Sequence, residues 1–476
     1  MVKDGEVVSF ESAANGKFVE PETAVSDQFT LEQAVYIARE QFGAGIDELP
    51  ARKVYVEKSD GTLALAHQFQ IRDRRKYIFA QVSIDVTNGQ IVQYVDFMSH
   101  ATYEVLKVPK LSPDEGFDIL KDPQYVPSSP NGWHSDGTKS FTDTQGNNVI
   151  VTKASQKPDG GADLNFVTQY DPTKPPNDTF NAAASAVNLF YIANYMHDVL
   201  YQYGFTEKTG NFQADNFGKG GAGGDRVTIE VLSTSGTNNA NFATPPDGQS
   251  GHMNMFRFDA FSPNRDSGFA NDVVMHEYCH GVSNRLTGGS RQANCLSGTE
   301  SSGMGEGWSD TCALYLNRKA TETRDIQVKI AAYLTKNGKG FRKFPYSTDM
   351  TVNPNTYEKL NGLTVVHDIG EIWAIMLYEM YWNLVDKYGF SDNWYDSNQL
   401  KGNIIALRLV MGGMTLQPCN PKLLSARDAI IRFDLHYYQG VNKCLIWKAF
   451  SKRGMGPNAS SVGGKYTNDF SLPAGC

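Results

Sequence analysis

The segment from Asn271 to Gly281, which reads NDVVMHEYCHG, constrains the fold of this 476-residue chain more than any other feature. Its histidines, His276 and His280, are four residues apart, so a helix would place both on one face, where they could bind one metal ion. Neutral imidazole suits Zn²⁺, and the carboxylate of Glu277 would lie beside the bound ion. There Glu277 could deprotonate a zinc-bound water that attacks a peptide carbonyl. The apolar residues 273–275 favour a helix buried in a core.

The third metal ligand must come from another part of the chain, because catalytic zinc sites supply three protein ligands and leave one position open. The metzincin spacing would require Gly at 283 and His at 286, but the chain has Ser283 and Leu286. Downstream, the segment SGMGEGWSD places Glu306 at the start of a second predicted helix. Asp310 follows on the same helical face, where it could accept the free ring N–H of a ligand histidine. Either carboxylate alone would more often be a surface group.

The composition excludes several functional classes. Acidic residues outnumber basic ones by 52 to 44, and the formal net charge of −8 argues against a nucleic-acid-binding coat. No stretch approaches about 18 uninterrupted apolar residues, so we expect no membrane-spanning helix. With 40% hydrophobic and 20% charged residues, the chain has the composition of a folded protein.

The six cysteines favour an oxidising compartment. All of them follow residue 278 and none forms a CxxC pair, so their even number suits disulfides in a secreted protein. The start of the chain, residues 1–6, lacks the apolar core of a signal peptide. We therefore expect either a cytoplasmic protein or a secreted one whose signal peptide is absent from this chain. The sequons at Asn177 and Asn458 would carry glycans only in the second case.

Local patterns predict a small α+β unit followed by a larger domain. Residues 1–100 contain a capping box at Thr30–Gln33, a helix that ends at Gly43, and strands joined by a Thr87–Gly89 turn. The basic run Arg72–Lys76 is interpreted as a hairpin loop, with a processing site or a ligand patch as the alternatives. Further on, the pattern predicts β structure with long loops over 101–180, a helix over 181–203, a strand over 226–232 and mainly helices over 271–450.

Two segments together, His276–Gly281 and Gly303–Asp310, closely resemble the fungalysin family of secreted fungal metalloendopeptidases. The resemblance covers most of the chain, and it is supported by residues 188–191, 197–198, 203–205, 211–213, 238–248, 366–373, 444–447 and 452–454. It implies an α+β, thermolysin-like metallopeptidase of two lobes, preceded by a small α+β prodomain. The implied parts are the C-terminal half of a prosegment (PepSY-like, 1–100), a β-rich N-terminal lobe (101–275) and a mainly helical C-terminal lobe (276–476).

The same resemblance implies a role for each site residue. One zinc ion per chain would be bound by His276, His280 and Glu306, with Glu277 as the general base and Asp310 orienting a ligand. His367 resembles the histidine that stabilises the oxyanion, the alternative being a structural histidine. Asn239, Ala240 and Asn241 resemble the edge strand that pairs with substrate, the alternative being an Asn-rich turn. Cys279 departs from the family, which commonly has Thr or another small residue there; a disulfide to Cys312 and a buried free thiol are both open.

We therefore expect a secreted, zinc-dependent endopeptidase that cleaves internal peptide bonds of extracellular proteins. The resemblance implies a latent zymogen whose own prosegment is its inhibitor, with a processing junction near Ala101. Its partners would be protein and peptide substrates, with no nucleic acid and no membrane, and we expect a monomer. Calcium is allowed, but no site is assigned. The alternatives are a zinc metallo-aminopeptidase, for which we find no motif that captures a free amine, and an inactive zinc-stabilised binding protein, which would favour four closed ligands.

Overall fold

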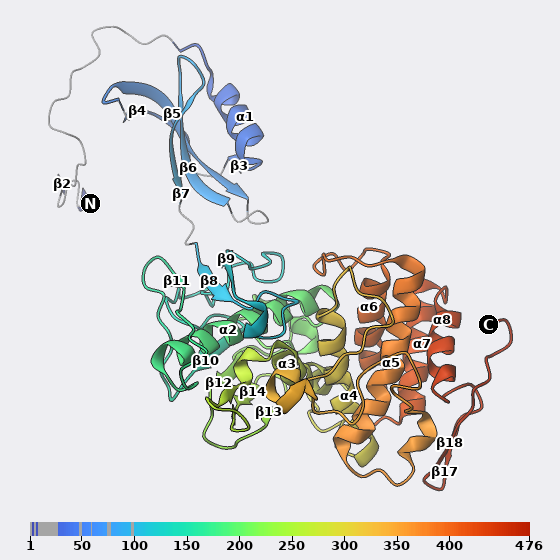
Figure 1. The fold of residues 1–476 in the computed structure, drawn as a ribbon. Coiled ribbons are helices and arrows are strands. Elements are labelled where there is room, and N and C mark those ends of the chain that lie inside the picture. The colour runs from blue at the N-terminus through green and yellow to red at the C-terminus, as the bar shows by residue number, and fades with distance from the viewer. Residues whose placement is uncertain are drawn as a thin grey trace. The chain divides into compact units, whose positions relative to one another are not determined.

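The computed structural model describes residues 27–46, 50–58, 60–73, 78–96 and 100–476, together with the short strands β1 (Val2–Lys3) and β2 (Glu6–Val7). The basic run predicted at 72–76 lies partly outside the described residues, as does the first part of the predicted prodomain. The chain divides into two compact units, residues 1–99 and 100–476 (Figure 1). Each unit has a hydrophobic core of its own.

The first unit is a helix packed on an antiparallel sheet. Helix α1 (Leu31–Phe42) begins at the predicted capping box, in which Thr30 and Gln33 exchange side-chain and backbone hydrogen bonds, and it ends at Gly43 with φ of 65°. Its buried face, Ala34 and Ala38, belongs to the same core as apolar residues of the sheet. The strands are β3 (Gly45–Ile46), β4 (Arg52–Glu57), β5 (Leu63–Asp73), β6 (Ile78–Asp85) and β7 (Ile91–Asp96). The predicted Asn-Gly turn joins β6 to β7, which pair antiparallel.

The second unit begins with a lobe rich in β structure. One sheet has the order β11-β8-β9 and another has the order β10-β12-β14-β13, in which β13 is an edge strand antiparallel to β14. The long helix α2 (Thr179–Gln202) packs on β8 and β10 and is almost entirely buried. The strands are β8 (Thr102–Val105), β9 (Asp118–Lys121), β10 (Val149–Thr152), β11 (Asn165–Phe166), β12 (Val227–Glu230), β13 (Ala240–Ala243), β14 (His252–Met255), β15 (Arg257–Phe258) and β16 (Arg265–Asp266).

The remainder of the second unit is mainly helical, as Figure 1 shows in yellow to red. Its helices are α3 (Asn271–Leu286), α4 (Thr299–Leu316), α5 (Val366–Tyr388), α6 (Gly402–Leu416), α7 (Leu423–Tyr438) and α8 (Lys443–Lys452), followed by the hairpin β17 (Ser460–Val462) and β18 (Lys465–Thr467). Short 3₁₀ turns occur at Pro113–Glu115, Glu207–Thr209, Ser267–Phe269, Ala332–Leu334, Lys336–Gly338 and Tyr357–Leu360. The lobe border expected at residue 276 falls within α3. This α+β architecture confirms the predicted fold class.

Glycines bring α4 and α5 unusually close together. A Cβ atom on Gly307 would lie 2.6 Å from the carbonyl oxygen of Gly370, and one on Gly370 would lie 2.5 Å from Cβ of Glu306. Next to this contact the rings of Trp308 and Trp373 meet edge to face, with centroids 5.0 Å apart. Gly307 on α4 and Gly370 on α5 therefore allow α5 to approach the side of α4 that bears Glu306.

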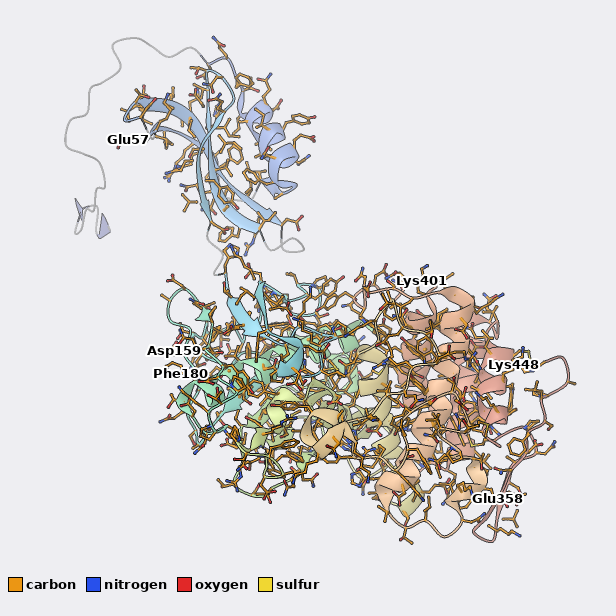
Figure 2. The ribbon with its side chains drawn as sticks, viewed as in Figure 1. Glu57, Asp159, Phe180, Glu358, Lys401 and Lys448 are labelled. Atoms are coloured by element: carbon orange, nitrogen blue, oxygen red, sulfur yellow. A yellow bond between two sulfur atoms is a disulfide. The ribbon has the colours of Figure 1, made fainter. Side chains whose placement is uncertain are left out.

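Three disulfides stabilise the helical lobe. Cys279–Cys312 joins α3 to α4, and the others are Cys295–Cys419 and Cys444–Cys476. Of the two possibilities left open for Cys279, the structure shows the disulfide to Cys312, and the alternative of a buried free thiol is wrong. Charged side chains such as Lys401 and Lys448 lie at the surface of this lobe (Figure 2). In the part of the chain that the structure describes, no helix combines the length and apolarity needed to cross a membrane.

Candidate active site

Helix α3 presents the two histidines of the HExxH segment on one face, as their spacing predicts. The Nε2 atoms of His276 and His280 lie 3.1 Å apart, and the two rings are nearly perpendicular. His276 is 6% exposed, so its ring is removed from bulk water. Two nitrogen lone pairs that converge on one point are suited to sharing a cation.

Helix α4 brings Glu306 to the same point. Its Oε2 lies 3.3 Å from Nε2 of His276, and its Oε1 lies 3.8 Å from Nε2 of His280. Ligands about 2.1 Å from a tetrahedral zinc ion are separated by about 3.4 Å, which matches these distances. Oε2 is buried and accepts no hydrogen bond from the described residues. The donor set and its spacing therefore fit a zinc ion held by these three residues.

The electrostatics around the histidines favour positive charge. Burial alone would lower the pKa of His276, but its hydrogen bond to Asp310 and the negative charge of Glu306 raise that pKa to about 10. Burial and the neighbouring charge of His276 lower the pKa of His280 to about 4. The carboxylates of Asp310 and Glu306 thus stabilise one positive charge at the pair of histidine rings. A metal cation bound at the same point would be stabilised by the same carboxylates.

Asp310 lies one turn after Glu306 and orients His276. Its Oδ1 accepts a hydrogen bond of 2.7 Å from Nδ1 of His276, which directs Nε2 toward the other candidate ligands. The same carboxylate accepts two hydrogen bonds from Arg342, from Nε at 2.6 Å and from Nη2 at 2.7 Å, and one from the hydroxyl of Tyr346. Sequence reasoning missed both donors, which lie in an irregular segment without a motif.

Glu277 lies beside the candidate ligands and is buried. It is 6% exposed, and its Oε2 accepts no hydrogen bond from the described residues. Burial and the nearby charge of Glu306 raise the pKa of Glu277 to about 7, although the positive charge of His276 opposes this shift. An unpaired carboxylate of this kind can accept a proton near neutral pH.

His367 is the second residue of α5 and lies at the open side of the candidate site. Its side chain is 51% exposed, and its Nε2 is 3.2 Å from Oε2 of Glu306. Burial of the rest of the ring lowers its pKa. The structure therefore brings His367 to the candidate ligands from a segment 61 residues after Glu306 in the sequence.

The three residues predicted to bind substrate lie at the edge strand β13. Ala240 is 8% exposed and pairs with Met255 of β14, whereas Asn239 and Asn241 are exposed. The side chain of Asn241 accepts a hydrogen bond of 3.0 Å from Nδ2 of Asn254. The interpretation of this segment as an Asn-rich turn is wrong for residues 240–243, which form a strand.

A glycine of α3, the helix that carries the two candidate histidine ligands, makes room for β13. A Cβ atom on Gly281 would lie 2.7 Å from the ring of Phe212 and 2.9 Å from that of Phe242, a residue of β13. Because Gly281 directly follows His280, the edge strand packs immediately beside the candidate metal site.

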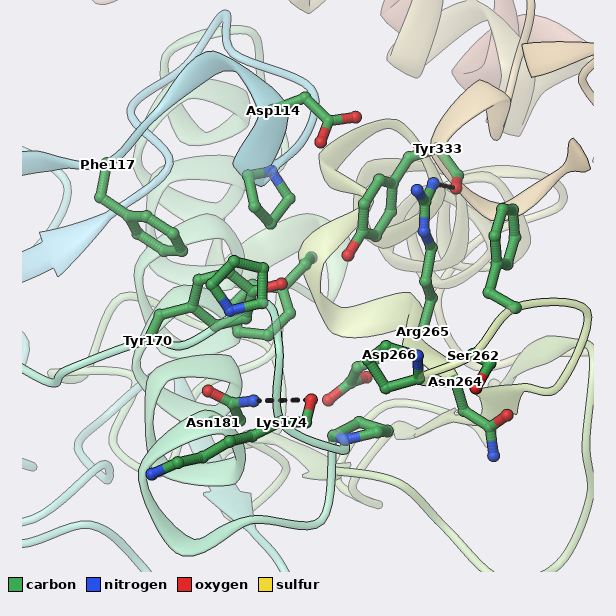
Figure 3. Close-up of a pocket in the computed structure, with 16 residues that line it drawn as sticks. Asp114, Phe117, Tyr170, Lys174, Asn181, Ser262, Asn264, Arg265, Asp266 and Tyr333 are labelled. Carbon is green, nitrogen blue, oxygen red and sulfur yellow. Dashed lines mark hydrogen bonds between the residues drawn. The ribbon is translucent and has the colours of Figure 1, made fainter. Parts of the chain in front are cut away.

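A separate pocket of about 350 Å³ lies where β16 and the first turns of α2 meet the segment around Tyr333. Figure 3 shows Arg265 beside Tyr333; its guanidinium lies 4.3 Å from the centroid of that ring and 3.9 Å from that of Phe261. Arg265 also donates a hydrogen bond to the carbonyl of Tyr333. The described residues that line this pocket do not include the candidate metal ligands.

The fold and the site together define a metallopeptidase, and comparisons with known proteins give the family. The model of the fungalysin metallopeptidases (M36) matches residues 102–459. Extracellular metalloproteinase 10 of Coccidioides posadasii is 41% identical over 447 residues, which cover 90% of this chain and 70% of the relative. Extracellular metalloproteinase 5 of Arthroderma otae is 42% identical over 442 residues, covering 90% and 69%. The chain belongs to the fungalysin family and is a metalloendopeptidase. This result favours endopeptidase activity over the two alternatives drawn from the sequence, a zinc metallo-aminopeptidase and an inactive zinc-stabilised binding protein.

Proposed function

We propose that this protein is a secreted endopeptidase that uses one zinc ion, held by His276, His280 and Glu306, to hydrolyse internal peptide bonds of extracellular proteins. The observation that carries the proposal is the convergence of these ligand atoms within 4.8 Å of one another, next to the buried Glu277. The relatives' names support secretion, because they describe extracellular enzymes.

Zinc bound at this point would supply a Lewis acid that polarises the attacking water and the scissile carbonyl. Glu277 takes a proton from the water as it attacks and delivers it to the leaving amine, a transfer for which its unpaired oxygen is free. His367, on the open side of the site, donates a hydrogen bond to the oxyanion that develops on the carbonyl. Asp310 holds the ring of His276 in place throughout.

Strand β13 orients the substrate in this proposal. A peptide in extended conformation would add to the sheet beside β13, whose backbone groups supply affinity without reading the sequence. The side chain of Asn239 is exposed and can bind the peptide main chain, and Asn241 is held by Asn254 in a defined orientation. Because β13 packs closely on α3, a peptide bound in this way would lie beside Glu277.

Latency is the remaining part of the proposal. Residues 1–100 would act as the C-terminal half of a prosegment, and a tethered inhibitor is effective because the linkage raises its local concentration. Cleavage near Ala101 would release the active enzyme. Incubating the purified chain and sequencing the new N-termini tests this proposal. Full activity of the uncut chain, or a first cut beyond residue 130, would contradict it.

The experiment that tests the activity uses a peptide blocked at both ends, which an aminopeptidase cannot attack. We expect the cut enzyme to hydrolyse it, a chelator to abolish the reaction and zinc to restore it. Glu277→Gln should lower kcat by about 10²–10⁴-fold through loss of proton transfer, with zinc still bound. Glu300→Gln is the matched control, because Glu300 is a buried carboxylate on α4 that contacts Leu423 and Tyr466 instead. Near-normal turnover by Glu277→Gln would refute the assignment of the base.

A further inference from the structure

Helix α5 carries a buried acid, Glu371, one turn after His367. Glu371 is 2% exposed, and both of its carboxylate oxygens are engaged. Oε2 accepts a hydrogen bond of 2.8 Å from the backbone N–H of Lys343, and Oε1 accepts one of 3.2 Å from that of Phe344. The side-chain amide of Asn355 donates a third, of 2.9 Å, to Oε1. Glu371 thus anchors the backbone of a segment that is distant in sequence.

The anchored segment contains the two donors that hold Asp310. Arg342 directly precedes Lys343, and Tyr346 follows Phe344 by two residues. The backbone over 342–345 is neither helix nor strand, so regular hydrogen bonding does not determine its path. Bonds from Phe341 to Ile330 and between Tyr346 and Val328 hold its two ends. Between these ends, the described hydrogen bonds to the backbone N–H groups are those made by Glu371.

We propose that Glu371 is a positioning residue for the metal centre: it fixes the 342–346 segment so that Arg342 and Tyr346 meet Asp310. Asp310 in turn orients His276 through Nδ1. The inference rests on the proposed zinc site. In this proposal α5 has two roles: it carries His367, and through Glu371 it supports the candidate ligands on α3 and α4.

A carboxylate suits this position because three donors converge on its two oxygens and the side chain of Glu371 is buried. Replacing Glu371 by Gln keeps one acceptor oxygen, and replacing it by Ala leaves both backbone N–H groups without their side-chain acceptor. The segment must then move to satisfy these groups, and Arg342 moves with Lys343. The guanidinium makes a forked contact of 2.6 and 2.7 Å with Asp310, a geometry that tolerates little displacement.

The test measures zinc affinity by competition with a chelator, together with kcat, KM and thermal stability. Glu371→Ala should raise the Kd for zinc by about tenfold, at the lower end of the 10–100-fold effect of direct partners of a ligand. Glu371→Gln should fall between Glu371→Ala and the unmodified enzyme. kcat should fall while KM stays nearly constant, because β13 does not contact this segment in the described hydrogen bonds.

Asp434→Ala is the matched control. Asp434 is a fully buried carboxylate on α7 that accepts hydrogen bonds from the backbone and the side-chain amide of Asn442, so its removal leaves similar groups unpaired. It should lower thermal stability without changing the Kd for zinc. If Glu371→Gln and Glu371→Ala lower stability in the same way and leave the Kd and kcat unchanged, Glu371 is only structural and the inference is overturned.

Asp310→Asn distinguishes this failure from a failure of the proposed site. It should weaken zinc binding at least as much as Glu371→Ala, because Asp310 contacts His276 directly. If Asp310→Asn weakens zinc binding and both Glu371 variants do not, only the role of Glu371 is refuted. If Asp310→Asn also leaves zinc binding unchanged, the proposed metal centre itself is wrong.

Discussion

Removing the Cys279–Cys312 disulfide by a double substitution to alanine should destabilise the enzyme by an amount that its loop length sets. The cysteines are 33 residues apart, and the chain-entropy model assigns such a loop about 4 kcal/mol of unfolding free energy. With an unfolding entropy of about 2.1 cal/mol/K per residue, the roughly 380 residues of the second unit give about 0.8 kcal/mol/K. The melting temperature should therefore fall by about 5 °C.

The Cys444–Cys476 disulfide provides a matched comparison, because its cysteines are 32 residues apart and the entropy model gives the same value. Cys279 and Cys312 are each 1% exposed in the core, whereas Cys444 and Cys476 are partly exposed. The segment that follows β18 is almost wholly irregular, so it can detach before the core unfolds and its disulfide should contribute less to global stability.

Calorimetry at one scan rate measures both double variants. We expect a fall of about 5 °C or more for the Cys279–Cys312 variant and a smaller one for the Cys444–Cys476 variant. The zinc content of both should stay stoichiometric at 25 °C, since the glycine contacts of α4 with α5 remain. Equal shifts for the two variants, or no shift for the first, would refute this reasoning.

Three further predictions concern single residues. Glu306→Ala should lose zinc on dialysis and unfold at a lower temperature, because metal binding and folding are coupled; stoichiometric zinc would require another ligand. His367→Ala should keep its zinc and lower kcat by about 10²–10³-fold, and a change confined to KM would contradict its proposed role. The backbone nitrogen of Ala101 lies 2.8 Å from Oδ1 of Asp122, so a cut before Ala101 would create an ammonium–carboxylate pair. In the uncut chain this carboxylate already pairs with His100, which the cut removes, so the comparison uses a His100→Ala background. There Asp122→Asn should destabilise the cut enzyme by about 1 kcal/mol more than the uncut chain, and equal thermal shifts would argue against that cleavage site.

The candidate site divides into a part that local spacing predicts and a part that it does not. His276 and His280 share a helix face because they are four residues apart, and the same holds for Glu306 and Asp310 on the next helix. Arg342 and Tyr346 belong to an irregular segment, so their meeting with Asp310 depends on tertiary contacts that no periodicity reveals. Glu371 did have a signal, because it follows His367 by one helical turn.

The fold shows the same division. The capping box of α1 and the turn between β6 and β7 rest on side chains a few residues apart, and both were predictable. The sheet that carries β13 pairs Ile150 with Thr228 and Ile229 with Met253, so its order depends on contacts across long stretches of chain. Without the resemblance to fungalysins, the local composition of residues 238–246 favours a turn over the observed edge strand.

Anomalous diffraction at the zinc absorption edge, from crystals of the cut enzyme, would locate the metal and so test the proposed zinc site directly. We expect one strong peak between Nε2 of His276, Nε2 of His280 and the carboxylate of Glu306, about 2.0–2.2 Å from each ligand atom. The carboxylate of Glu277 should lie beside the peak without coordinating it. A peak at another cluster of side chains, or a zinc ion closed by four protein ligands, would contradict the claim that these residues form a catalytic zinc site.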